Sequence, residues 1–223
     1  MDDSKTAVIT CNLGGFDKPI EHAEQSVDYD YFNFTDKNFP PRDKSFTPRM
    51  QAKIPKCFGW QLKPGYDSYL WIDGNLRMKD KHTLEYFRDQ LEGYDVVVLK
   101  HPTHDTVHWE YRYCWRGLHN NAPSNYMRER YTNEWLDEQY KVIADDKDYE
   151  DDSMVNGGIF MYRNTPEVQA MLKEWWYYIS RYLIMDQLSW IYVLKKSGLK
   201  INILPIVFND CRWLENERHK IHG

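Results

Sequence analysis

The sequence lacks several features that would each point to a particular class of protein. Its four cysteines are scattered and form no CxxC pair, which argues against a zinc cluster of that spacing and against a disulfide framework. No stretch approaches the roughly 20 apolar residues that span a bilayer. The formal net charge of −5 is too weak to attract nucleic acid. A strand is predicted from about Ala7, with no room for a signal peptide before it, so we expect a soluble, cytoplasmic protein with reduced thiols.

Aromatic residues, by contrast, are abundant. They make up 16% of the chain, with 17 Tyr and 9 Trp. Aromatic rings pack on the C–H faces of sugars and on nucleobases, although most of them fill a core in any protein. The cluster Trp175-Trp176-Tyr177-Tyr178 has the spacing of a core helix face. Composition therefore permits a sugar-binding function without requiring one.

Apolar runs and amphipathic segments alternate along the chain, which predicts an α/β fold. No repeat, linker or low-complexity segment interrupts the 223 residues, so we expect a single domain over residues 1–223. Strands are predicted at residues 7–11, 27–34, 66–73, 94–99, 154–162 and 201–205. Helices are predicted at residues 49–58, 84–91, 105–141, 166–179 and 183–195. This order predicts a Rossmann-like fold with a mainly parallel central sheet flanked by helices.

The most informative segment is the strand end LWIDGN at residues 70–75. A strand of buried type ends on Asp73, Gly74 and Asn75, at the edge where open α/β sheets bind ligands. Asp73 and Asn75 both offer oxygen atoms, which Mg²⁺ and Mn²⁺ prefer together with substrate phosphates. Because Asp-Gly is also a turn dipeptide, the spacing alone leaves two interpretations open, a metal site and a simple turn.

The segment resembles the DxD motif of GT-A glycosyltransferases, with Asn75 in place of the second acid. A closer resemblance, to the plant mucilage and pollen-turgor family of glycosyltransferase-like proteins, covers much of the chain. It implies a GT-A-like fold, Mn²⁺ or Mg²⁺, a UDP- or GDP-sugar donor and a glycan acceptor. It also implies a nucleotide-binding half at residues 1–100 and a sugar and acceptor half at residues 101–223. The matching elements are Arg49, Ala52-Lys53, WIDG at 71–74 (with Trp71), His101-Pro102, Glu110, Trp175-Trp176 and DQLS at 186–189, with Met185 and Trp190 where the family has Arg and Phe.

The nucleotide part of the expected donor site comes from two segments in the first half. By likeness to GT-A proteins, Thr10, Cys11 and Asn12 would border the base and ribose. The same three residues are also typical of an ordinary strand end. Arg49 and Lys53 lie four residues apart on a predicted helix and therefore point the same way. They would either neutralise the donor diphosphate or form a solvated basic face.

The sugar part is expected in the second half. Asn156-Gly157-Gly158 resembles the glycine segment at which GT-A backbones approach the sugar hydroxyls. Asp186 and Gln187 open a helix and would contact the sugar or the acceptor, unless Asp186 only stabilises the helix dipole. An inverting enzyme also needs a carboxylate base, and a retaining enzyme does not. The candidates for that base are Asp152, Asp186 and Glu110.

The histidines complete the list of candidate residues. Asp73, Asn75 and His219 (or His222) would form the metal shell, although a polar C-terminal tail is the simpler interpretation of that histidine. His101, His104 and His108 have irregular spacing and no cysteine nearby, which favours a donor-sugar contact or a plain surface over zinc. Two other functions stay open, a metal-dependent hydrolase and a non-catalytic carbohydrate-binding module. The hydrolase would normally show denser metal ligands, and the binding module would not need a strand-end acid beside a basic pair.

Overall fold

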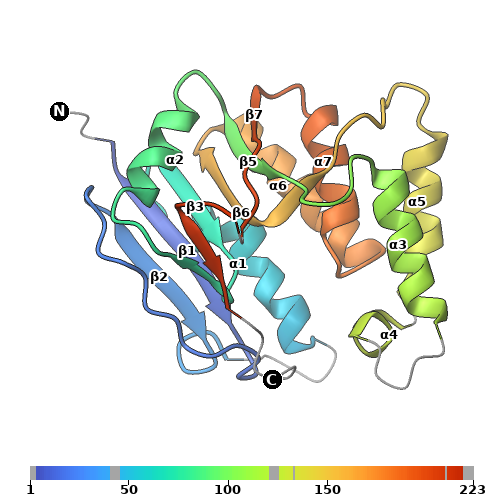
Figure 1. The fold of residues 1–223 in the computed structure, drawn as a ribbon, viewed down its shortest axis with the longest axis horizontal. Coiled ribbons are helices and arrows are strands. Elements are labelled where there is room, and N and C mark those ends of the chain that lie inside the picture. Colours follow the sequence, from blue (N-terminus) through green and yellow to red (C-terminus); the bar gives the residue numbers. More distant parts are fainter. Residues whose placement is uncertain (1–3, 41–45, 121–125, 133, 209, 218–223) are drawn as a thin grey trace.

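A computed structural model describes residues 4–40, 46–120, 126–132, 134–208 and 210–217. Six strands form the central sheet, in the spatial order β2-β1-β3-β6-β5-β7 (Figure 1). β6 runs antiparallel to both of its neighbours, and the other three pairings are parallel. The predicted α/β fold with a mainly parallel sheet is therefore confirmed, with β6 as an unpredicted reversal. The strands are β1 (Thr6–Asn12), β2 (Asp30–Thr35), β3 (Ser68–Ile72), β5 (Val96–Lys100), β6 (Val155–Arg163) and β7 (Ile201–Leu204).

Helices cover the sheet and extend beyond one end of it. α1 and α6 pack against each other, and α6 also packs against α7, which contacts β6. α3, α4 and α5 lie together at the far side of α7 (Figure 1). No helix within the described ranges is both long and apolar enough to cross a membrane. The helices are α1 (Pro48–Leu62), α2 (Thr83–Leu91), α3 (Val107–His119), α4 (Tyr126–Tyr131), α5 (Leu136–Asp145), α6 (Pro166–Arg181) and α7 (Gln187–Lys196).

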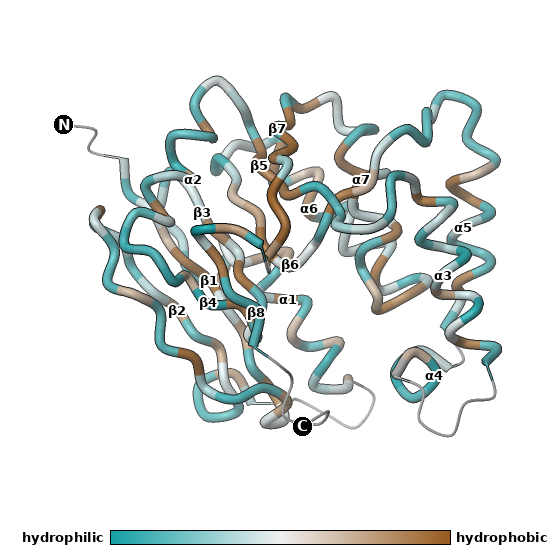
Figure 2. Tube along the Cα trace, in the orientation of Figure 1, coloured by the Kyte–Doolittle hydropathy of each residue, from teal (hydrophilic) through white to brown (hydrophobic). Residues whose placement is uncertain are grey.

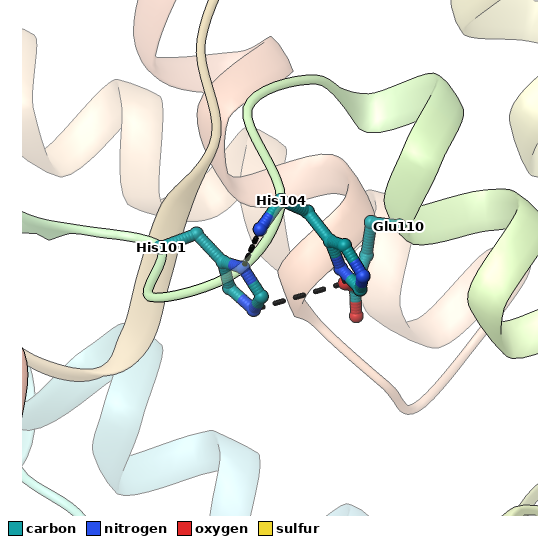
Figure 3. Close-up of side chains that lie close together, drawn as sticks. All are labelled: His101, His104 and Glu110. Atoms are coloured by element: carbon teal, nitrogen blue, oxygen red, sulfur yellow. Dashed lines mark hydrogen bonds and ion pairs between the residues drawn. The ribbon is translucent and has the colours of Figure 1, made fainter.

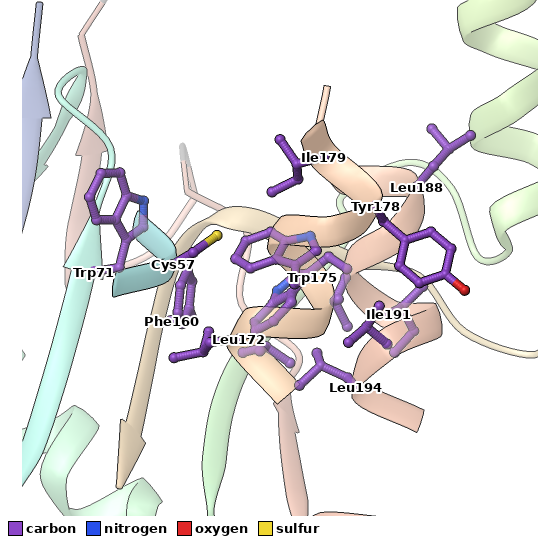
Figure 4. Packing of buried hydrophobic residues seen from close by; sticks show 14 of the residues in the cluster. Cys57, Trp71, Phe160, Leu172, Trp175, Tyr178, Ile179, Leu188, Ile191 and Leu194 are labelled. Carbon is purple, nitrogen blue, oxygen red and sulfur yellow. The ribbon is translucent and has the colours of Figure 1, made fainter. Parts of the chain in front are cut away.

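The core consists of two hydrophobic layers, one on each face of the sheet. The larger layer includes Trp175, whose ring stacks on Trp190 at 4.0 Å and meets Phe160 edge-on at 5.6 Å (Figure 4). The smaller layer lies between the sheet and α2. Hydrophobic segments accordingly run through the centre of the molecule, while α3 and α5 are largely hydrophilic (Figure 2). Trp175 therefore belongs to the core, as its helical spacing predicts.

Several element boundaries differ from those predicted. α1 continues to Leu62 in spite of Pro55, and only Phe58 inside it has non-helical dihedral angles. The polar region predicted as one helical stretch at 105–141 divides into α3, α4 and α5. A small ribbon of β4 (Leu76–Met78) and β8 (Leu214–Asn216) was not predicted, because strands this short carry little periodicity. The cap at the start of α6 is as predicted, since Thr165 accepts a hydrogen bond from the backbone N–H of Val168 at 3.3 Å.

Candidate functional site

A cleft of about 520 Å³ opens where β1 and β3 end. Its size falls within the range of small-molecule sites. One wall comes from the strand ends and the other from α1 and the α4 region. The lining residues are Cys11, Asn12, Leu13, Gly14, Phe16, Asp17, Thr47, Pro48, Arg49, Ala52, Lys53, Lys56, Trp71, Asp73, Gly74, Asn75, Glu129, Arg130, Glu134 and Ile184.

Asp73 lies at the end of β3, as predicted, and is held there by three contacts. Its backbone N–H donates to the carbonyl of Gly158 in β6 at 2.7 Å. Its Oδ1 accepts from the indole Nε1 of Trp71 at 2.7 Å and lies 3.3 Å from the ammonium of Lys56. The side chain is still 38% exposed. The carboxylate is therefore fixed in place but open to a ligand in the cleft.

Lys56 is a site residue that the sequence analysis missed. Its side chain is only 2% exposed, and its Nζ lies 2.7 Å from Asp186 Oδ2 as well as 3.3 Å from Asp73 Oδ1. The rings of Trp71 and Trp175 each lie 5.5 Å from the same ammonium. One buried cation thus joins the carboxylate at the end of β3 to the carboxylate at the start of α7. A buried lysine needs such partners, because an unpaired charge in the core is costly.

Asp186 also pairs with Lys53, at 2.7 Å. Burial raises the pKa of this carboxyl, but the two lysines lower it overall to about 2. Burial lowers the pKa of Lys53, whereas for Lys56 the two carboxylates outweigh burial and raise the pKa. Asp186 makes no side-chain cap to α7. Its place at a helix start therefore serves the ion pairs and not the capping of the helix.

A smaller cavity of about 150 Å³ lies beside the cleft. A Cβ at Gly157 would lie 3.6 Å from Lys56 Nζ and 3.7 Å from Asp186 Oδ1, so the backbone there faces the lysine-bridged acids. The structure thus brings Asp73 and Asn75 together with the residues predicted to contact the sugar. The lining residues are Asp73, Asn75, Leu76, Asn156, Gly157, Gly158, Asp186, Gln187, Phe208 and Asn216.

The basic residues of the cleft come mainly from one face of α1. Arg49, Lys53 and Lys56 follow at i, i+4 and i+7, which places them along one side of a helix. Arg49 donates a hydrogen bond to the backbone carbonyl of Arg130, and its guanidinium lies 5.3 Å from the ring of Tyr131. These contacts link α1 to α4 beside the cleft, which Arg49 and Arg130 both line. Arg130, which the sequence analysis did not single out, adds a further cation to the lining.

Two of the three residues predicted at the end of β1 line the cleft. Cys11 and Asn12 line the cleft, whereas Thr10 is buried and lines neither cavity. Burial raises the pKa of the Cys11 thiol to about 12, which keeps it protonated and unreactive. Asn12 fixes the following loop, because its Nδ2 donates to the carbonyl of Asp17 at 2.9 Å. Gly74 is needed for close approach, since a Cβ there would lie 3.0 Å from the Cys11 carbonyl oxygen.

Asp152 lies apart from these residues. Its side chain is more than half exposed and forms an ion pair with Lys195 on α7. It also accepts a hydrogen bond from Ser153 Oγ at 2.8 Å. Asp152 lines neither the cleft nor the smaller cavity. The structure thus brings Asp186 into the site and leaves Asp152 outside both cavities.

Glu110 is buried in a cluster with two histidines (Figure 3). His104 Nδ1 hydrogen-bonds to Glu110 Oε2, and His101 Nε2 lies 3.7 Å from the same oxygen. Gln187 Nε2 donates to Glu110 Oε1 at 3.0 Å, which connects the cluster to the smaller cavity. His108 is elsewhere, with its Nδ1 2.6 Å from the hydroxyl of Tyr140.

The ligand atoms of His101, His104 and Glu110 lie within 4.8 Å of one another, as in a metal site. One hydrogen bond of His101 argues against that use, because it occupies the Nδ1 lone pair of the ring. His101 Nδ1 accepts the backbone N–H of His104 at 2.9 Å, so a neutral ring carries its proton on the Nε2 that faces Glu110. Burial lowers the pKa of His101, which favours this neutral form. The cluster is therefore better described as a carboxylate accepting hydrogen bonds from its neighbours than as a zinc site.

The fold, a mainly parallel sheet with a cleft at its strand ends, is of the GT-A type. Among solved structures, the apo bifunctional glycosyltransferase WbbM is similar at a TM-score of 0.51 and 14% identity, over 91% of this chain and 39% of that chain. Mouse xyloside xylosyltransferase 1 is similar at a TM-score of 0.44 and 11% identity, over 90% of this chain and 85% of that chain. No curated protein sequence matches the chain.

The family is established by a sequence model. Residues 38–222 match the family described as TOD1/MUCI70, glycosyltransferase-like domain. This match covers most of the chain, and the chain belongs to that family. The resemblance that rested on the WIDG and DQLS segments is thereby confirmed.

GT-A enzymes generally use a divalent cation, and the end of β3 fits part of the coordination shell of such an ion. Asp73 offers a partly exposed carboxylate, and the Asn75 amide oxygen remains available because Nδ2 is the atom that donates to Asn216, at 2.8 Å. Within the described ranges, no group of three His, Cys, Asp or Glu ligands includes Asp73. These residues therefore fit an ion that takes most of its ligands from phosphates and water. The other predicted ligand, His219, lies outside the described residues.

Proposed function

We propose that this protein transfers a hexosyl or pentosyl group from a nucleoside diphosphate sugar to a glycan acceptor, with Mn²⁺ or Mg²⁺ bound at Asp73 and Asn75. The observation that carries the proposal is the Lys56 ammonium, 3.3 Å from Asp73 and 2.7 Å from Asp186. It joins a carboxylate suited to a metal and phosphates to one suited to sugar hydroxyls, at the edge of the sheet where α/β folds bind ligands.

The first half of the chain, residues 1–100, would bind the nucleotide. Cys11 and Asn12 line the cleft and would border the base and ribose. Arg49 and Lys53 point into the same cleft and would hold the diphosphate by charge-assisted hydrogen bonds. When bound, the divalent cation would offset the charge that develops on the departing diphosphate. The basic face of α1 would add to this stabilisation. A UDP- or GDP-sugar is the expected donor.

The second half, residues 101–223, would hold the sugar and the acceptor. Asp186 has a pKa of about 2 and is a weak base, so we assign it to accept hydrogen bonds from sugar hydroxyls. Gln187 and the backbone of Asn156–Gly158 line the same cavity and would complete this contact. Of the other carboxylates considered as a base, Glu110 already accepts a hydrogen bond from Gln187, and Asp152 is paired with Lys195.

Thermal-shift measurements with UDP and GDP, each with Mn²⁺ or EDTA, test this function. A nucleotide-sugar transferase should be stabilised by one nucleoside diphosphate together with Mn²⁺, as expected for linkage between binding and folding. A carbohydrate-binding module should respond to oligosaccharides and to neither nucleotide. A hydrolase should respond to the metal alone. Either of the last two results would overturn the proposal.

A further inference from the structure

A strip of rings runs from the outer face of α3 to the start of β6. We call it the α3 ring strip. Tyr113, His104 and His101 are in ring contact, and Trp109 lies about one helical turn before Tyr113 on α3. The ring centroids of Tyr113 and His104 lie 5.2 Å apart. His104 stacks on His101 at 4.9 Å with an interplanar angle of 9°. The backbone N–H of His101 donates to the carbonyl of Met154 at 2.9 Å, so the strip ends beside the strand whose first residues line the smaller cavity.

The outer end of the strip is open to solvent. Trp109 and Tyr113 are 56% and 57% exposed, and their four-residue spacing places them on one face of α3. A different face of the helix is covered, because Tyr111 stacks on Tyr140 of α5 at 3.9 Å. Large exposed aromatic rings in a row are typical of a surface that binds something. Here the row leads toward the proposed sugar site.

The strip also carries polar groups at fixed positions. Glu110 accepts a hydrogen bond from Gln187, and its carboxylate faces the Nδ1 of His104, which is therefore the nitrogen that donates when the ring is neutral. The Nε2 of His104 is then a hydrogen-bond acceptor. The phenol of Tyr113 adds a group that both donates and accepts. Gln187 thus ties the strip to the smaller cavity a second time, independently of the His101 backbone.

We infer that the α3 ring strip is the binding site for the acceptor glycan. The C–H faces of successive pyranose rings would pack on Trp109 and Tyr113, as apolar surface packs on aromatic faces. A hydroxyl of the residue nearest the cavity would donate to His104 Nε2. The acceptor would then approach the donor sugar from the β6 side, past Gln187. This inference rests on the proposed function, since it assigns the acceptor of the same reaction.

The test compares two surface variants of α3. Trp109→Ala/Tyr113→Ala removes the exposed rings of the strip. Trp115→Ala is the matched control, because Trp115 is also an exposed aromatic of α3 (38%) but stacks on His119 outside the strip. Saturation-transfer NMR and calorimetry with a panel of neutral and uronic-acid-containing hexasaccharides measure glycan binding. UDP and GDP binding with Mn²⁺ is measured on the same samples, and thermal melting checks that each variant folds.

The expected result is that the wild type binds at least one hexasaccharide and that the double variant binds it about tenfold more weakly, as for a lost aromatic contact. Trp115→Ala should keep the wild-type affinity. Equal losses in both variants, no loss in either, or no glycan binding by the wild type would overturn the inference. Glycan binding without nucleotide binding would instead contradict the proposed transferase function, so the two failures are distinguishable.

Discussion

Lys56 Nζ lies 2.7 Å from the carboxylate of Asp186, although the two residues are far apart in the sequence and both are buried. The same ammonium lies 3.3 Å from Asp73. A buried ion pair contributes little net stability compared with a well-packed apolar core, but breaking one by removing a single partner is strongly destabilising. The Lys56 ammonium lies between the two carboxylates that we propose for the metal and the sugar, which favours a role in the site over a role in stability.

Removing the Lys56 ammonium should therefore destabilise the protein. In Lys56→Met, Asp186 keeps only Lys53 as its partner, and we expect a loss of about 3 kcal/mol in the free energy of unfolding. Urea denaturation measures it. Lys141→Met is the control, since Lys141 pairs with Asp145 on the surface of α5 and should leave the midpoint nearly unchanged. Similar midpoints for the two variants would show that the buried pair has no special role.

The dependence of stability on pH should reveal the ion pairs that Asp186 forms with Lys53 and Lys56. Its pKa is lowered to about 2 in the folded protein, below roughly 3.9 for an unfolded chain. The ionised pair therefore stabilises the fold above pH of about 4, and this contribution, on the order of 2 kcal/mol, is lost as the pH falls toward about 2. Asp186→Asn should flatten that part of the stability curve. Denaturation at several acidic pH values measures both proteins. If the free energy of unfolding falls with pH equally in the wild type and in Asp186→Asn, the lowered pKa does not belong to Asp186.

Nucleotide binding should depend on Arg49 and not on basic residues elsewhere. Arg49→Ala should weaken the binding of UDP or GDP by about 1.5–3 kcal/mol, the value for a hydrogen bond to a charged group. Lys53→Ala should act in the same direction but also disturbs Asp186, so Arg49 gives the clearer result. Arg181→Ala on α6 is the control, because that guanidinium lies over Trp135 and Tyr182. Calorimetry that finds equal affinity in wild type and Arg49→Ala would remove Arg49 from the site.

Gly157 offers a test of the sugar cavity that leaves the fold intact. An added Cβ would make only ordinary contacts, 3.6 Å to Lys56 Nζ and 3.7 Å to Asp186 Oδ1. Gly157→Ala should therefore melt close to the wild-type temperature. The methyl group would occupy the space proposed for the sugar, and turnover should fall by about 10²-fold, as for a small misplacement at a reacting centre. Wild-type turnover of a donor sugar in this variant would place the sugar elsewhere.

Much of this site was predictable because the chemistry lies at strand and helix ends. Asp73 and Asn75 follow an apolar run whose composition identifies a strand, so their place at the edge of the sheet follows from an α/β fold. The glycines at 157–158 lie near the start of β6 and reach the same edge only because β6 runs antiparallel to β3. Asp186 and Gln187 were predicted from their resemblance to a family motif. The structure adds that Asp186 is held by two lysines, a contact that local sequence cannot encode.

Lys56 was missed for a physical reason. It lies in a helix whose predicted course was doubtful because of Pro55, and a lysine is normally read as exposed. Its place at i+7 from Arg49 was a usable signal, since the two share a helix face with Lys53. The reversal of β6 was also missed, because a strand surrounded by predicted parallel neighbours carries no mark of its direction. Thr10 lies off the cleft because it is buried inside β1, two residues before the strand ends at Asn12.

The Asn75 amide is the position at which this chain departs from the acidic motif of GT-A proteins. Asn75→Asp adds a charge at the same reach and should tighten Mn²⁺ binding, measured by the Mn²⁺ dependence of nucleoside diphosphate affinity. The gain should be lost when Asp73 is also replaced by Ala. An unchanged metal dependence in Asn75→Asp would mean that this side chain, which hydrogen-bonds to Asn216, does not face the ion.

The most direct test of the account is calorimetric binding of UDP and GDP to the wild type and to Asp73→Ala, each with Mn²⁺ and with EDTA. The account predicts that the wild type binds one of these nucleotides markedly more tightly with Mn²⁺. It predicts that Asp73→Ala, while still folded, loses that difference, because the carboxylate at the end of β3 is the main protein ligand of the ion. The account would be contradicted if the wild type bound the nucleotide equally well with Mn²⁺ and with EDTA, or if Asp73→Ala kept the full metal dependence. Asp73 would then be only the first residue of a turn.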